Sequence, residues 1–173
     1  MLRLLFALTL LPLLACDSND SDGCERFEFA LAAEASPTHV ASCTSSACGN
    51  GMNPPSAGPH CSTTLACRVY DAEQSSCSWL HNLEHGHAVF LYNCPEGCPD
   101  EVAKLEAIQK EAKRGGNDVP RAIVAPASGL PNRVAAILWR RTYLADSADP
   151  AALRCLLALQ DQGAPEPGIS CSP

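Results

Sequence analysis

Short apolar runs in the second half of the chain predict the strands of a small sheet. Residues 88–92 (AVFLY) form a continuous apolar run with β-branched and aromatic side chains, which is typical of an interior strand. Residues 122–125 (AIVA) form a second run of this kind. In residues 134–144 (VAAILWRRTYL) side chains of different polarity alternate, so we interpret this stretch as a third strand.

Two other stretches have the pattern of helices that lie on a sheet. Residues 99–114 begin with proline and acidic residues, end in basic residues, and are followed by Gly115 and Gly116. The apolar stripe of this helix consists of Val102, Leu105, Ile108 and Ala112. The second helix is expected from Asp149, as the N-cap before Pro150, through Gln160.

The remaining segments have weaker patterns. Residues 24–35 fit either a short strand or a helical turn, and both readings stay open. Residues 36–77 are rich in glycine, proline, serine and cysteine, which favours ordered loops held by disulfides. The expected fold class is therefore α+β: a small sheet with two flanking helices and a disulfide-rich, loop-dominated N-terminal half. The pattern predicts one globular domain over residues 24–173, without repeats.

The N-terminus resembles an export signal. A short basic lead precedes an apolar run from Leu4 to Ala15, which is too short to span a bilayer as a helix. The sequence Leu-Leu-Ala-Cys ending at Cys16 resembles the bacterial lipobox, so residues 1–15 are interpreted as a lipoprotein signal peptide and Cys16 as the lipidated residue. The alternative is an ordinary signal peptide with Cys16 as a bystander. If Cys16 is lipidated, residues 16–23 are expected to form a flexible, acidic tether between the lipid and the domain.

The cysteine count agrees with export. The chain has 11 cysteines, and lipidation of Cys16 would leave an even set of ten. These ten could form five disulfides: Cys24, Cys43, Cys48, Cys61, Cys67, Cys77, Cys94, Cys98, Cys155 and Cys171. Their pairing does not follow from the sequence, although Cys94 and Cys98 are close enough to close a small loop. A zinc cluster is the weaker alternative, because no pair of C-x2-C units occurs and the compartment is oxidising.

The charge balance narrows the range of partners. Removal of the signal peptide would leave 11 Lys and Arg against 19 Asp and Glu, a net charge of −8. An acidic surface argues against nucleic acid and against recruitment to anionic lipids by charge. We therefore expect no nucleic-acid partner, an unidentified protein partner if any, and attachment to a bacterial membrane through the lipid anchor, in the periplasm or cell envelope.

The candidate chemistry lies in the histidines. All five occur between His39 and His87, and three of them surround Glu84 in the stretch His81-Asn-Leu-Glu-His85-Gly-His87. If a strand starts at His85, then His85 and His87 share a face; if a helical turn precedes Gly86, then His81 and His85 share one. Either arrangement brings two imidazoles together, and neutral imidazole is a ligand for zinc, copper, nickel or iron.

The same stretch fits H-x-x-E-H, the inverted zinc-peptidase pattern. That chemistry requires both histidines on a sustained helix. Gly86 and the apolar run behind it are expected to limit any helix to about one turn, so we treat the match as coincidental.

A second histidine follows a rigid loop. Asn53-Pro-Pro-Ser-Ala-Gly-Pro-His60 has three prolines and a glycine, which fix much of the backbone in advance. Together with His81-Asn-Leu-Glu-His85-Gly86, this loop resembles the paired signature NPPTSGPH and HNLEHG of the bacterial extracytoplasmic family of unknown function DUF3105. The resemblance covers residues 39–160, implies a shared site that includes a histidine near His39, and implies membrane tethering. It brings no established activity.

Two departures from the family pattern concern the loops. Cys61 stands where the family usually has an aromatic residue, and most of the cysteines look like additions. Disulfides are therefore expected to replace aromatic packing around the first motif.

Three functional hypotheses remain at this stage. The first is a metal-binding lipoprotein, with His60, His81, His85 and His87 as copper or zinc ligands and His39 and Glu84 as further candidates. The second is a hydrolytic or redox enzyme at the same site, with Glu84 as general base and a metal-bound water. The third is a disulfide-stapled interaction module whose histidines are structural.

Overall fold

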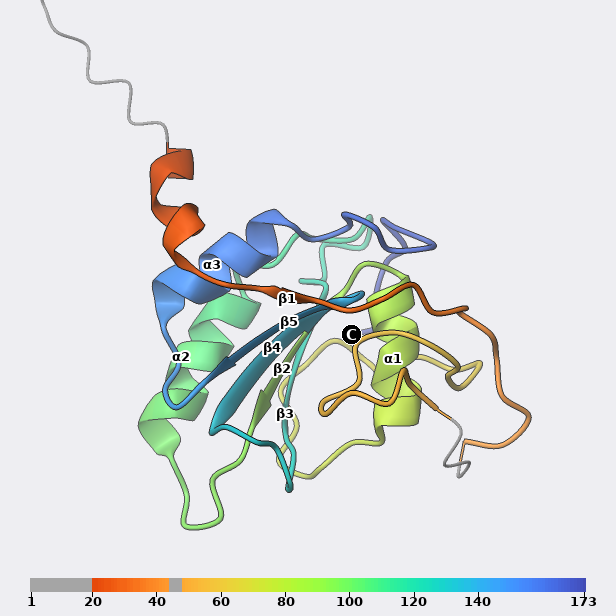
Figure 1. The fold of residues 1–173 in the computed structure, drawn as a ribbon, viewed down its shortest axis with the longest axis horizontal. Helices are drawn as coiled ribbons and strands as arrows, with labels where there is room; N and C mark the ends of the chain where they lie inside the picture. Colours follow the sequence, from red (N-terminus) through yellow and green to blue (C-terminus); the bar gives the residue numbers. More distant parts are fainter. Residues whose placement is uncertain (1–19, 44–47) are drawn as a thin grey trace, which may run out of the picture.

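A computed structural model describes residues 20–43 and 48–173 of the chain. The predicted signal peptide, Cys16 and the tether as far as residue 19 lie outside the described residues. The expected α+β class is confirmed (Figure 1). The strands are β1 (Ala30–Leu31), β2 (Ala88–Tyr92), β3 (Ala122–Pro126), β4 (Val134–Leu138) and β5 (Arg141–Ala145). The helices are the 3-10 helix η1 (Asp20–Arg26) and the α-helices α1 (Ser76–Glu84), α2 (Pro99–Gln109) and α3 (Pro150–Ala158).

All five strands belong to one mixed sheet in the order β1-β5-β4-β2-β3. Strands β2 and β3 are parallel and are joined through α2, because parallel neighbours need a long crossover connection. The pairs β2–β4, β4–β5 and β1–β5 are antiparallel. The central strands β2 and β4 are buried along nearly their whole length, which explains why they are apolar at every position.

Helices cover both faces of the sheet (Figure 1). Helices α2 and α3 pack through Leu105, Ile108 and Leu156 against one face, which includes Phe90 of β2. Helix α1 covers the opposite face through Trp79, Leu80 and Leu83, which join Val89 and Leu91 of β2 and Ile137 of β4. The sequence predicted the first pair of helices. The third helix, α1, is additional, and it carries most of the candidate site.

The third predicted strand is in fact a hairpin. Residues 134–144 were interpreted as one strand, but β4 ends at Leu138, and Trp139 and Arg140 form the two-residue turn into β5. Arg140 adopts a φ of +64°. Turns with a positive φ are usually recognised in a sequence by glycine or asparagine, and neither residue occurs at this turn. The backbone N–H of Arg140 donates to the Ser56 carbonyl at 2.7 Å, so the hairpin turn holds the proline-rich loop.

The helix boundaries differ modestly from the expectation. Helix α2 ends at Gln109 rather than at residue 114, because the next turns are irregular and the N–H of Lys113 donates to the Gln160 side chain at 3.0 Å. Helix α3 begins as predicted: the Asp149 carboxylate accepts the N–H groups of Ala151 and Ala152. The open segment 24–35 contains both alternatives, the end of η1 and the short strand β1.

The ten cysteines of the described residues form five disulfides. The pairs are Cys24–Cys155, Cys43–Cys61, Cys48–Cys77, Cys67–Cys171 and Cys94–Cys98. Two of them hold the loop segment around residues 43–61, and Cys67–Cys171 joins the C-terminal segment to the face of the sheet that α1 covers. Such a set of disulfides suggests an oxidising, extracytoplasmic environment. Among the described helices none is long and apolar enough to cross a membrane.

Candidate metal centre

Helix α1 brings two of the candidate residues onto one face. His81 and Glu84 are three positions apart, and His81 Nε2 lies 3.5 Å from Glu84 Oε2. The helix has nine residues, so the expectation of about one turn was wrong. Gly86 ends the turn behind it at a φ of +78°, and a Cβ there would lie 2.4 Å from the Asp161 carboxylate. The chain can therefore pass directly from α1 into β2.

The proline-rich loop delivers His60 to the same place. The ring is fully buried, and its backbone pairs with the segment around His39: His60 N–H donates to the Thr38 carbonyl at 3.0 Å, and Val40 N–H to the His60 carbonyl at 2.8 Å. Asn50 supports the loop from within, since its side chain accepts the Ser56 N–H and donates to the Ser56 hydroxyl. His39 and His60 are thus aligned side by side, with His39 at the solvent edge.

Gly58 is expected to be intolerant of any side chain. Its φ is +106°, and a Cβ would lie 2.7 Å from the backbone carbon and oxygen of Gly49. Gly58→Ala should lower the free energy of unfolding by about 2–3 kcal/mol through the clash together with the backbone strain. Gly51→Ala is the matched control, because Gly51 also has a positive φ of +77° but nothing within 4 Å of the added Cβ.

Urea unfolding of both variants measures the difference. Gly51→Ala should cost only about 1 kcal/mol, the strain alone. Equal losses in the two variants would show that the close approach of the Gly58 and Gly49 backbones does not limit the loop.

Three histidines converge on one carboxylate oxygen. Glu84 Oε2 lies 2.9 Å from His60 Nε2, 3.5 Å from His81 Nε2 and 3.9 Å from His39 Nε2. The three rings form a nearly equilateral triangle, with centroids separated by 5.1 Å, 4.9 Å and 5.0 Å. One ligand atom from each of the four residues lies within 4.8 Å of all the others. We call this set the three-histidine cluster: His39, His60, His81 and Glu84.

The hydrogen bonding of His60 makes its Nε2 an acceptor. His60 Nδ1 lies 2.8 Å from the Gly58 carbonyl oxygen, which can only accept, so Nδ1 carries the hydrogen. In a neutral ring, Nε2 then directs a lone pair at Glu84 Oε2, which offers only lone pairs when ionised. Two such atoms 2.9 Å apart need a cation between them, either a proton or a metal ion.

The His81 ring is held in the neutral form. Burial, together with the nearby His85, His60 and His39 rings, lowers the pKa of His81 to about 4. The ring is therefore uncharged at neutral pH, which is the state that ligates metals. His81 Nδ1 is buried and makes no hydrogen bond of normal geometry to the described residues. The nearby Cys61 backbone raises the pKa of His81, but by less than burial lowers it.

His85 lies next to the three-histidine cluster and contacts Glu166. Its Nε2 lies 3.4 Å from Glu166 Oε2, on the segment that follows α3, although its ring centroid is only 4.5 Å from that of His81. Burial lowers the pKa of His85, and the Glu166 and Glu84 carboxylates oppose that shift. The two histidines of the H-x-x-E-H match thus belong to different groups of ligand atoms: His81 lies with His39 and His60, and His85 lies with Glu166. Glu84 belongs to both groups.

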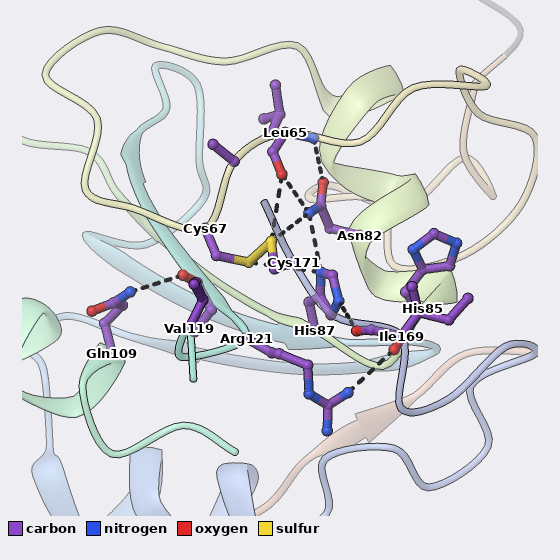
Figure 2. Close-up of a disulfide and its surroundings, with 12 residues drawn as sticks. Leu65, Cys67, Asn82, His85, His87, Gln109, Val119, Arg121, Ile169 and Cys171 are labelled. Carbon is purple, nitrogen blue, oxygen red and sulfur yellow. Dashed lines mark hydrogen bonds between the residues drawn. A yellow bond between two sulfur atoms is a disulfide. The ribbon is translucent and has the colours of Figure 1, made fainter. Parts of the chain in front are cut away.

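The structure does not bring His87, one of the expected ligands, into the three-histidine cluster. Figure 2 shows its ring between Asn82 and Ile169, beside the Cys67–Cys171 disulfide. His87 Nε2 donates to the Ile169 carbonyl at 2.8 Å, and Nδ1 accepts from the Asn82 amide at 3.1 Å. Burial lowers its pKa to about 4. Both ring nitrogens of His87 therefore have hydrogen-bond partners within the protein.

The sulfur atoms near His87 are not ligands either. Cys67, His87 and Cys171 lie close enough together to hold a metal ion, but the two cysteines are bonded to each other. A disulfide has no thiolate to offer. In the candidate groups of the described residues, the available metal ligands are therefore imidazole and carboxylate side chains.

Two functional side chains were missed from the sequence. Asn82 clamps the loop at Leu65 by accepting its N–H at 2.8 Å and donating to its carbonyl at 2.9 Å. Glu166 reaches His85 from a position far along the chain. Asn82 lies inside the HNLEH motif, which was a usable signal; for Glu166 the signal was the flanking pair Pro165 and Pro167, which fixes its backbone.

Fold and site together define a disulfide-braced α+β domain with a histidine–carboxylate cluster able to hold a metal ion. A family model described as "Protein of unknown function (DUF3105)" matches residues 39–173, and the chain belongs to this family. No match was found among the curated proteins or among the solved structures. The family range begins at His39, the first residue of the three-histidine cluster.

Proposed function

We propose that this protein is a lipid-anchored, extracytoplasmic metal-binding protein whose tight site is the three-histidine cluster. The observation that carries the proposal is the convergence of His39, His60 and His81 through Nε2 on Glu84 Oε2. Metal-ligating histidines commonly donate their other nitrogen to a carbonyl, and His60 does so to Gly58. The buried acceptor pair of His60 and Glu84 supplies the local demand for a cation.

The spacing of the donors fits a first-row transition metal. An ion about 2.0–2.1 Å from nitrogen and oxygen ligands in a tetrahedron sets those atoms about 3.3 Å apart. The contacts of Glu84 Oε2, at 2.9, 3.5 and 3.9 Å, bracket this value. Three imidazoles and one carboxylate favour Zn²⁺ or Cu²⁺. The same ligands disfavour Cu⁺, which prefers sulfur. Met52, a possible thioether ligand, is 57% exposed on the loop and does not belong to the three-histidine cluster.

The N-terminal sequence supports the proposed place of the protein in the cell. The lipobox-like residues that end at Cys16 support lipid attachment, and the disulfides support an oxidising compartment. The membrane is thus the proposed partner through the acyl chains, with the residues between Cys16 and the start of η1 at Asp20 as the tether. A protein held in this way would present its metal centre at the cell envelope.

Zinc titration of the metal-free full chain tests the proposal. Wild-type protein should bind one equivalent of zinc tightly, and His39→Ala should weaken the affinity for that equivalent by at least about 100-fold. The His39 side chain is 51% exposed, so its removal should leave the fold intact. His85→Ala is the matched control, because it removes a neighbouring histidine that faces Glu166 instead, and it should keep the tight equivalent.

Elemental analysis of protein purified without an affinity tag or chelator gives an independent reading. About one equivalent of zinc or copper supports the proposal. A chain that retains no metal and binds neither ion on titration would overturn it, and would leave the histidines with a structural role in an interaction module.

A further inference from the structure

A second group of potential ligands shares Glu84 with the three-histidine cluster. One donor atom each from Glu84, His85 and Glu166 lies within 4.8 Å of the other two. Two of these residues come from the C-terminal end of α1, and Glu166 comes from the segment after α3. Two different chain segments therefore meet at the same carboxylate.

The backbone of Glu166 is fixed although its side chain is exposed. Its N–H donates to the Glu84 carbonyl at 3.0 Å, which ties this segment to the end of α1. Pro165 and Pro167 flank it and restrict the backbone on both sides. The carboxylate is 58% exposed and stands next to His85. Its presentation at this point is thus built into the chain rather than left to a mobile tail.

The surrounding contacts reinforce this placement. Arg121 makes two hydrogen bonds to the Asp161 carboxylate, at 2.7 and 2.8 Å. Figure 2 shows the second contact of its guanidinium, which donates to the His85 carbonyl at 3.4 Å. Asp161 in turn accepts the Gly168 N–H at 3.2 Å. The positive charge of Arg121 is therefore paired, and it is not available to neutralise Glu84 or Glu166.

The charges and donors match a second divalent ion. His85 Nε2 and a Glu166 oxygen lie 3.4 Å apart, close to the separation of about 3.3 Å expected for two ligands of one ion. Glu84 has two carboxylate oxygens, one of which, Oε2, serves the three-histidine cluster. Two ions that share a carboxylate typically lie about 3.5–4 Å apart, as in hydrolytic two-metal sites.

From this geometry we propose that the protein holds a dinuclear centre in which Glu84 bridges two divalent metal ions. The first ion is bound by His39, His60 and His81, and the second by His85 and Glu166. This inference rests on the proposed metal-binding function. The second ion binds more weakly, because it has three protein ligands and one of them stands in solvent. Water completes its coordination.

Zinc titration of the metal-free full chain by calorimetry and equilibrium dialysis tests the second site. Wild-type protein is expected to bind two equivalents, one tight and one weaker. Glu166→Gln is expected to keep the tight equivalent and to weaken the other by at least about tenfold. Glu96→Gln, the same change at an exposed glutamate in the loop closed by Cys94 and Cys98, should bind as wild type does.

A spectroscopic measurement reports the bridge itself. Protein loaded with two equivalents of Cu²⁺ should show the spin coupling of two nearby ions in its EPR spectrum, with a half-field signal that Glu166→Gln abolishes. The uncoupled spectrum of one Cu²⁺ should remain in that variant.

Each outcome separates the two proposals. A single tight equivalent that Glu166→Gln leaves unchanged overturns the dinuclear centre and keeps the proposed function. Two equivalents that both survive Glu166→Gln also overturn the assignment of the second site. Absence of any bound zinc overturns both proposals together.

Discussion

Glu84→Gln is expected to weaken the tight equivalent of zinc by at least about 1,000-fold and to abolish the second. The carboxylate is the group on which three imidazoles converge, and its side chain is only 6% exposed. Glutamine keeps the shape but removes the negative charge, and its amide can present N–H groups to the lone pair of His60 Nε2. The metal site would then lose its charge and one ligand while the cavity stays filled.

The stability of the metal-free variant separates this effect from misfolding. Because a neutral amide can donate to His60 Nε2, metal-free Glu84→Gln should unfold at nearly the same urea concentration as the wild type. Calorimetric zinc titration then measures the loss of binding, with Glu96→Gln as the control for the same substitution elsewhere. Retention of tight zinc binding by a folded Glu84→Gln variant would contradict the assigned role of the carboxylate.

Removal of the Cys67–Cys171 disulfide is expected to lower the free energy of unfolding by about 4 kcal/mol. The two cysteines are 104 residues apart, and such a loop corresponds to nearly 5 kcal/mol of chain entropy at most. The Cys43–Cys61 and Cys24–Cys155 bonds shorten the effective loop, which reduces the figure to about 4 kcal/mol. For a domain of this size the midpoint of thermal unfolding should fall by about 10 °C.

The matched control is removal of the Cys94–Cys98 disulfide, which closes a loop over four residues of separation. The double variant Cys94→Ala and Cys98→Ala should lose only about 2 kcal/mol of unfolding free energy. The double variant Cys67→Ala and Cys171→Ala should lose about 4 kcal/mol. Calorimetric unfolding of both double variants measures the difference. Equal costs would mean that the long-range bond does not restrict the unfolded chain in the expected way.

The sheet was predictable from the sequence where burial was uniform. Strand β2 is covered on both faces, so every side chain of AVFLY is apolar and the run stands out. The hairpin at Trp139 and Arg140 was missed because the alternation of polarity in residues 134–144 continues through the turn, as it would in a single strand. There a positive φ falls on an arginine, and tertiary hydrogen bonds to the Ser56 and Ala32 segments stabilise it rather than turn chemistry.

Helix α1 was underestimated because its sequence has few local helix signals. Ser75, at the N-cap, makes no side-chain capping hydrogen bond, and Gly86 follows closely after the last turn. What stabilises the helix is burial of Trp79, Leu80 and Leu83 against the sheet, a long-range effect that periodicity over so short a stretch does not reveal.

The sequence indicated which histidines to consider for the candidate site, but it did not show which of them lie together. The association of the loop ending in His60 with the stretch around Glu84 was expected, and the structure places them in contact. The separation of His85 and His87 from the cluster depends on where α1 ends and β2 begins. A shift of one residue there changes which face a side chain takes, so the sequence left both arrangements open.

X-ray absorption at the zinc edge, on full-length protein loaded with one equivalent of Zn²⁺, identifies the ligands of the tight site. We expect about three imidazole nitrogens and one carboxylate oxygen at about 2.0–2.1 Å, with no sulfur. His39→Ala should remove one imidazole from the spectrum, whereas His85→Ala should leave it unchanged. A sulfur ligand at about 2.3 Å, or a zinc spectrum with one imidazole or none, would contradict the account.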